Sequence, residues 1–116
     1  MSAAKKGDLV PRPHRKDEFE LRFATTRAQK GWRALVATQR NATVATWDSL
    51  TTSPLETTST NYRLKGDLGI ITRGSESHVR WQHKPTLRGS ARVWFYVDGA
   101  TVFIEQVHTD HPHQTA

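Results

Sequence analysis

The chain has 116 residues, of which 35% are hydrophobic, and its 17 lysines and arginines against 11 acidic residues give a formal net charge of +6 at pH 7. This length predicts a single domain with a modest core, and the absence of cysteine excludes disulfides, thiolate metal ligands and cysteine nucleophiles. No apolar run approaches the roughly 18 residues of a membrane span and the N-terminus has no hydrophobic signal core, so we expect a soluble cytoplasmic protein without a membrane partner.

The first 17 residues have little apolar content and a net positive charge. We predict a flexible basic arm over residues 1–17, a single domain over residues 18–113 and a short tail over residues 114–116. The arm either contacts nucleic acid or is a disordered, solubilising end.

A strand and two helices are predicted next. Residues 19–23 alternate apolar and polar side chains, which is the period of a half-buried strand. Thr25 or Thr26 offers an N-cap for a helix to about Gln39, with an apolar face formed by Ala28, Trp32, Leu35 and Val36. A second helix is predicted between a cap at Asn41 and Pro54, and its apolar side carries Val44, Trp47 and Leu50.

The remaining chain predicts antiparallel strands. A connector rich in Thr and Ser covers residues 51–61, and Asp98-Gly99 is a strong hairpin turn. The predicted strands are residues 68–72, 78–84, 91–97 and 101–107. We therefore expect an α+β fold with an N-terminal strand and a two-helix hairpin packed on a small antiparallel sheet of three to five strands.

Alternation along the predicted strands separates two faces. Val93, Phe95 and Val97 share the face expected to pack against the helices. The opposite face gathers cations and aromatic rings, which hold phosphate and stack on bases in RNA-binding sheets; its members are Arg80, Gln82, Lys84, Arg92, Trp94 and Tyr96. The alternative for Trp94 and Tyr96 is a cross-strand aromatic pair that only stabilises the sheet.

Charge is concentrated in the same region. Between Tyr62 and Arg92 there are seven basic residues (Arg63, Lys65, Arg73, Arg80, Lys84, Arg88, Arg92) and two acidic ones (Asp67, Glu76). Such an excess favours nucleic acid as partner, then an acidic protein, then an anionic membrane, while the alternative is a solvated basic surface.

The order of a strand, two helices and three or four antiparallel strands resembles the RelE/ParE family of bacterial type II toxins. The stretches that carry the resemblance are Tyr62–Gly66, Arg80–Lys84, Gly89–Asp98 and Thr101–His108. The resemblance implies the toxin of a toxin–antitoxin pair, held inactive by a cognate antitoxin. In the nuclease branch of this family it implies ribosome-dependent cleavage of mRNA without metal or other cofactor.

Such cleavage proceeds by attack of the ribose 2′-OH on the adjacent phosphate, and it needs a base, cations for the developing charge and an acid. Carried over to this chain, the family pattern assigns the catalytic roles to Lys84 and Arg92 as phosphate-stabilising cations and to His108 as acid or base. Supporting contacts to nucleic acid are expected from Arg63, Lys65, Arg80, Arg88, Trp94 and Tyr96.

Two alternatives stay open. One is a non-catalytic inhibitor on the same fold that binds gyrase or another protein, because the hairpin at residues 68–78 is longer than in small family members and eight residues follow His108. The other is a plain basic nucleic-acid-binding module. The sequence contains no P-loop, no GxGxxG, no GxSxG and no paired carboxylates on one predicted element, so ATPase, dehydrogenase, serine hydrolase and glycosidase interpretations have no support.

A histidine cluster ends the chain. His108 and His111 with Asp110 form a conceivable metal-ligand set, with His113 beside them. The segment is terminal and interrupted by proline, so we expect adventitious binding at most and predict no metal site.

Overall fold

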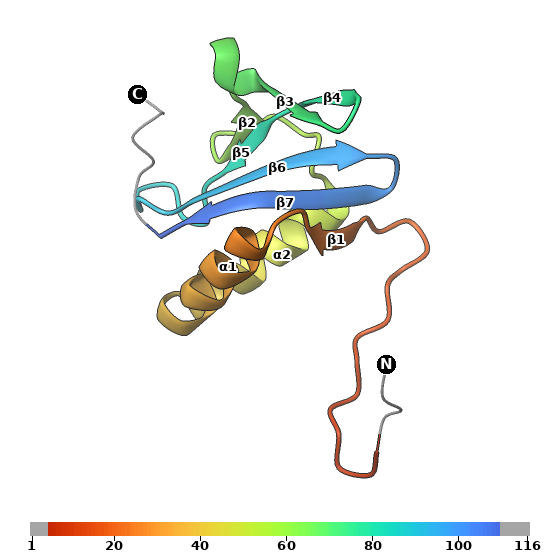
Figure 1. The fold of residues 1–116 in the computed structure, drawn as a ribbon. Coiled ribbons are helices and arrows are strands. Elements are labelled where there is room, and N and C mark those ends of the chain that lie inside the picture. Colours follow the sequence, from red (N-terminus) through yellow and green to blue (C-terminus); the bar gives the residue numbers. More distant parts are fainter. Residues whose placement is uncertain (1–4, 110–116) are drawn as a thin grey trace.

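A computed structural model describes residues 5–109. It contains two helices, a mixed five-stranded sheet and a separate two-stranded sheet, which is an α+β fold (Figure 1). The elements in chain order are β1 (Glu20–Phe23), α1 (Thr26–Thr38), α2 (Arg40–Thr52), β2 (Asn61–Arg63), the 3₁₀ turn η1 (Gly66–Gly69), β3 (Ile70–Arg73), β4 (Glu76–Val79), β5 (Trp81–His83), β6 (Arg92–Asp98) and β7 (Thr101–His108).

The five-stranded sheet has the order β1-β7-β6-β5-β2. β6 pairs antiparallel with β5 and β7, and β2 pairs antiparallel with β5, but β1 runs parallel to β7. The expectation of a purely antiparallel sheet is therefore wrong. Residue alternation reports which face of a strand is buried, and it carries no information about the direction of the neighbouring strand.

Helix α1 follows the prediction closely. The hydroxyl of Thr25 accepts a hydrogen bond from the Ala28 amide at 3.0 Å, and Ala28 and Leu35 are fully buried. Gly31 lies against β7, where a Cβ atom would collide with the Val107 carbonyl oxygen. This glycine costs helix propensity but lets α1 approach the sheet closely.

Helix α2 buries Leu50 as predicted and half-buries Trp47, but the rest of its buried face differs from the prediction. Its buried residues are Thr43, Thr46, Leu50 and Thr51, whereas Val44 is exposed. The cap is also different, because Gln39 precedes the helix and offers no side-chain hydrogen bond. The hydroxyls of Thr43 and Thr51 donate to the carbonyls of Gln39 and Trp47 one turn back, so these two side chains are buried with their polar atom satisfied. The hydroxyl of Thr46 is buried without a hydrogen-bond partner among the described residues.

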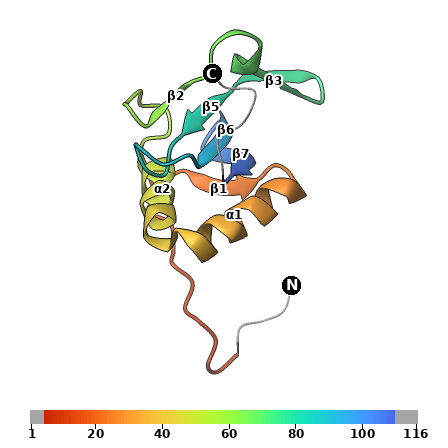
Figure 2. The same cartoon turned by 90° about the vertical axis from the view of Figure 1, so that its left-hand side faces the viewer.

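The predicted strand over residues 78–84 is divided between the two sheets. β4 pairs only with β3 in the two-stranded sheet, and the chain then crosses at Arg80 into β5 of the main sheet. In Figures 1 and 2 the helices lie on one side of the main sheet and the β3–β4 hairpin on the other. His78 of this hairpin stacks on Tyr96 of β6, with ring centroids 4.6 Å apart.

The described part of the N-terminal arm, residues 5–17, contacts helix α2. The guanidinium of Arg12 lies 4.7 Å from the centre of the Trp47 ring, and His14 lies 6.2 Å from it. Within residues 5–109, neither helix has the length and apolar character that a membrane crossing requires.

Candidate functional site

The face of the main sheet that points away from the helices carries most of the predicted site residues. Register places Tyr62, Gln82 and Trp94 side by side on neighbouring strands. The Trp94 indole donates to Gln82 Oε1 at 2.8 Å, and Gln82 Nε2 donates to the Tyr62 hydroxyl at 2.8 Å. These hydrogen bonds hold the side chains of Tyr62, Gln82 and Trp94 in place. We call this face of the sheet, which points away from the helices, the outer face.

An ion pair joins the crossing segment to the last strand. Arg80 donates to both carboxylate oxygens of Glu105, at 3.0 and 2.9 Å, and its guanidinium lies 5.2 Å from the centre of the Trp94 ring. Glu105 reaches the outer face because the ladder between β6 and β7 is irregular there, with Phe95 opposite Ile104 and Trp94 opposite Gln106. Arg80 is therefore a structural cation whose charge is already neutralised.

The two aromatic residues expected to stack on bases are buried. Trp94 is 1% exposed and Tyr96 is 7% exposed. Tyr96 lies between the rings of His78 and Phe103, at 4.6 and 5.2 Å. Neither ring offers a free surface to a base in this structure, which agrees with the alternative of a structural aromatic role.

The three residues predicted to be catalytic lie together. Arg92 is opposite His108 in the β6–β7 ladder. Lys84 follows His83, whose partner is Val93, so Lys84 is opposite Arg92 on the other side. Adjacent strands are about 4.8 Å apart, so the three residues form a row across the outer face that spans roughly 10 Å. We call this set the Lys84–Arg92–His108 row.

Arg92 is 7% exposed, and its Nη1 donates to the carbonyls of Gly89 and Ala91 at 2.7 and 2.8 Å. Among residues 5–109 its Nε has no hydrogen-bond partner, and no carboxylate forms an ion pair with it. A buried cation is costly without a counter-charge. No carboxylate of residues 5–109 therefore compensates the charge of Arg92, although its side chain is as enclosed as that of Tyr96.

His108 closes the row. Its ring meets Trp94 edge-on at 5.2 Å, and its Nε2 is enclosed without a hydrogen-bond partner in the described part of the chain. Burial and the nearby Arg27 lower the pKa of His108, and Glu105 opposes this shift. A lowered pKa keeps the imidazole neutral near pH 7, and a neutral imidazole can accept a proton.

Lys84 forms the other end of the row, beside Tyr62 of β2. The Lys84 ammonium lies 5.7 Å from the centre of the Tyr62 ring. This cation–π contact holds the flexible lysine over the outer face.

The other predicted contacts to nucleic acid are more scattered. Arg63 pairs with Trp81 and lies over that ring at 5.8 Å, so it lies on the face opposite to Tyr62. Lys65 and Arg88 are exposed on loops. His111 and His113 of the predicted histidine cluster, with Asp110, lie outside the described residues.

The sequence did not predict the side-chain interactions of three residues on the outer face: Glu105, Gln82 and Tyr62. One signal was present for Glu105: two polar residues in succession, Glu105 and Gln106, interrupt the alternation of the last strand. Such an interruption is typical of a β-bulge.

Comparison of the chain with protein-family models, with curated proteins and with solved structures gave no match.

Proposed function

We propose that the chain is the toxin of a type II toxin–antitoxin pair, with a RelE/ParE-like fold, that cleaves mRNA at the ribosome in the bacterial cytoplasm. The observation that carries the proposal is the Lys84–Arg92–His108 row, in which a buried arginine has no carboxylate partner among the described residues. The order of one strand, two helices and a sheet supports the fold part of the proposal. Its partners are the ribosome, mRNA and a cognate antitoxin.

The row supplies the groups that a metal-free cleavage needs. His108, neutral because its pKa is lowered, takes the proton of a ribose 2′-OH through Nδ1, since Nε2 is enclosed. The 2′-oxygen then bonds to phosphorus, and the bond from phosphorus to the 5′-oxygen breaks. Arg92 and Lys84 stabilise the charge that develops on the phosphate oxygens. The leaving 5′-oxygen takes a proton from water, and a 2′,3′-cyclic phosphate remains.

Inducible expression in a bacterial host tests the proposal. Wild type is expected to arrest growth and to produce new mRNA 5′ ends within translated frames, and Lys84→Ala and His108→Asn are expected to abolish both. Lys30→Ala removes the same charge from the exposed side of α1 and should leave the arrest intact. Circular dichroism of each purified variant checks that it is folded.

The outcomes separate the candidate functions. Growth arrest without cleavage, unchanged in His108→Asn, contradicts the nuclease and favours an inhibitor of gyrase or of another protein. Salt-dependent RNA binding without growth arrest favours a plain nucleic-acid-binding module. Arrest and cleavage that persist in both row variants would exclude the row as the site.

A further inference from the structure

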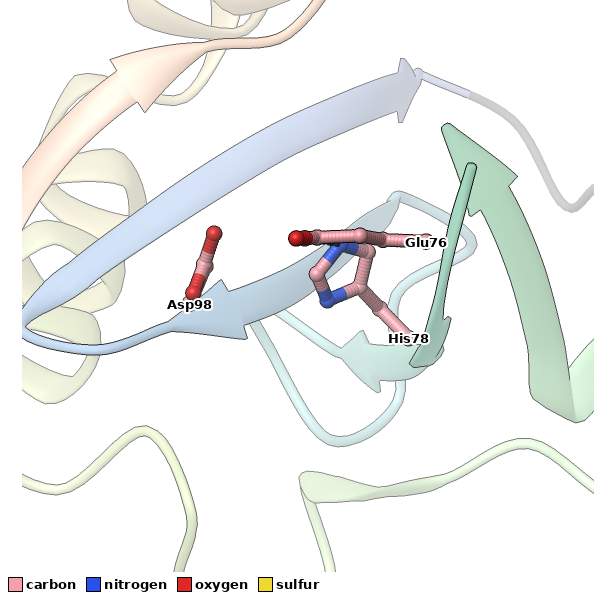
Figure 3. A group of neighbouring side chains, drawn as sticks. All are labelled: Glu76, His78 and Asp98. Atoms are coloured by element: carbon pink, nitrogen blue, oxygen red, sulfur yellow. Dashed lines mark ion pairs between the residues drawn. The ribbon is translucent and has the colours of Figure 1, made fainter. Parts of the chain in front are cut away.

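A second group of polar residues lies at the opposite end of the outer face, where the β3–β4 hairpin meets the β6–β7 turn. Glu76 and His78 come from β4 and Asp98 ends β6, and one ligand atom from each lies within 4.8 Å of the others (Figure 3). The Glu76 Oε2 and His78 Nε2 atoms are 3.6 Å apart. The Lys84–Arg92–His108 row uses none of these residues.

Local structure explains why the three side chains converge. Residues 76 and 78 are alternate residues of one strand, so they point to the same face of the hairpin. Asp98 lies two residues after Tyr96 on β6, and Tyr96 carries the His78 ring on its own ring, with an interplanar angle of 21°. Phe103 supports Tyr96 from the other side at 5.2 Å. The imidazole is thus positioned by a three-ring stack before any ligand binds.

The distances suit a small divalent transition metal. Tetrahedral zinc has ligands at about 2.0–2.1 Å, which places neighbouring donor atoms about 3.3 Å apart. The Glu76–His78 separation of 3.6 Å is close to that value. Asp98 and Glu76 are exposed carboxylates, and the Glu76 side chain is 69% exposed, so rotation can close the remaining gap.

The donor set narrows the choice of metal. One imidazole with two carboxylates favours Zn²⁺ or a similar ion over Ca²⁺ and Mg²⁺, which prefer oxygen ligands throughout. Arg73 is opposite Glu76 across the hairpin and contributes a positive charge near Tyr96, so two carboxylates and one guanidinium leave a single negative charge before binding. The two carboxylates together balance the charge of a divalent ion, and the guanidinium leaves the occupied site with one positive charge.

We propose that Glu76, His78 and Asp98 bind a zinc ion that fastens the β3–β4 hairpin to the β6–β7 turn. Three protein ligands leave the fourth position of the metal for water or an external ligand. The ion would supplement the contacts that hold the hairpin over the outer face, namely the His78–Tyr96 stack and the anchoring of Arg80 on Glu105.

The test is isothermal titration of the full chain with ZnCl₂. Every protein in the series carries His111→Ala and His113→Ala, so that the terminal histidines do not contribute heat. The parent is expected to bind one zinc ion and to gain about 5 °C or more in melting temperature at saturating zinc. Co²⁺ should give the visible absorption of a tetrahedral site.

Two variants remove one ligand each and preserve the fold. Asp98→Asn keeps the turn, because Asn-Gly is itself a favoured hairpin sequence, and His78→Phe keeps an aromatic ring on Tyr96. Both should lose the heat and the gain in melting temperature, whereas Glu56→Gln, a control at an exposed carboxylate of the α2–β2 connector, should keep them. Absence of zinc binding in the parent, or undiminished binding in Asp98→Asn and His78→Phe, would overturn the proposal.

Discussion

Replacing Glu105 by glutamine tests how much the ion pair with Arg80 stabilises the fold. The pair is almost enclosed, with the Glu105 side chain 4% exposed and the Arg80 side chain 13% exposed. Glutamine retains one acceptor oxygen, so one of the two hydrogen bonds at 2.9 and 3.0 Å survives and the other is lost. Its amide nitrogen instead faces the guanidinium, which then has no counter-charge.

The magnitude follows from these losses. A charge-assisted hydrogen bond contributes about 1.5–3 kcal/mol, and removing one partner of a buried ion pair costs about 3–5 kcal/mol. Because glutamine keeps one bond, we expect the free energy of unfolding to fall by about 3 kcal/mol. For a domain of this size that corresponds to a melting temperature lower by roughly 10–20 °C.

Urea denaturation followed by tryptophan fluorescence measures the change. Glu20→Gln is the matched control, because Glu20 pairs with Arg22 at the same 2.9 Å distance but with side chains 46% and 60% exposed, and it should cost less than about 1 kcal/mol. The double variant Arg80→Met with Glu105→Leu should be more stable than Glu105→Gln, since it leaves no buried charge unpaired. Equal losses for Glu105→Gln and Glu20→Gln would refute the reasoning.

Three further predictions concern stability. Burial lowers the pKa of His83 from 6.5 to about 4, so the unfolded chain binds the proton more readily than the folded chain. The contribution of neutral His83 to the free energy of unfolding is fully present above pH 6.5, and about 3 kcal/mol of it should be lost as the pH drops to about 4. Denaturation at a series of pH values should show this slope in wild type, and His83→Gln should remove most of it. Gly31→Ala should lower the free energy of unfolding by about 1–3 kcal/mol although alanine has the better helix propensity, because the added methyl group collides with Val107. A neutral or stabilising result in thermal denaturation would contradict the close packing of α1 on β7. Thr25→Ala should lower the free energy of unfolding by about 1–2 kcal/mol, because the Thr25 hydroxyl caps α1 and donates to the Glu105 carbonyl at 2.8 Å. Thr38→Ala at the exposed end of the helix is the control. Equal melting temperatures of the two variants would count against the cap.

The elements that depend on local signals could be predicted from the sequence. The alternation at residues 19–23, the Thr25 cap and the Asp98-Gly99 turn correspond to β1, α1 and the β6–β7 hairpin. Each signal lies within a few residues and reflects the backbone preferences of those residues. The resemblance to the toxin family assigned Lys84, Arg92 and His108 to one site, and the strand register of the structure places these three residues in one row.

The features that depend on distant partners could not be predicted. Arg80 was expected to be an exposed cation of a strand, but it is paired with Glu105, 25 residues away. Trp94 and Tyr96 were placed on the correct face, yet both are buried: His78 of the β3–β4 hairpin covers Tyr96, and Arg80 and His108 lie against Trp94. In α2 a threonine side is buried and Val44 is exposed; the hydroxyls of Thr43 and Thr51 are satisfied within the helix, whereas that of Thr46 has no partner among the described residues.

The most direct test of the central claim is an NMR titration of the protein with a short RNA whose cleavage site carries a 2′-deoxyribose, so that it binds without being cut. The account predicts that chemical-shift changes cluster at the end of the outer face that holds Lys84, Arg92 and His108, and that the His108 pKa rises when phosphate binds beside it. Changes confined to other surfaces, or none at saturating RNA in low salt, would contradict the assignment of this row as a phosphodiester site.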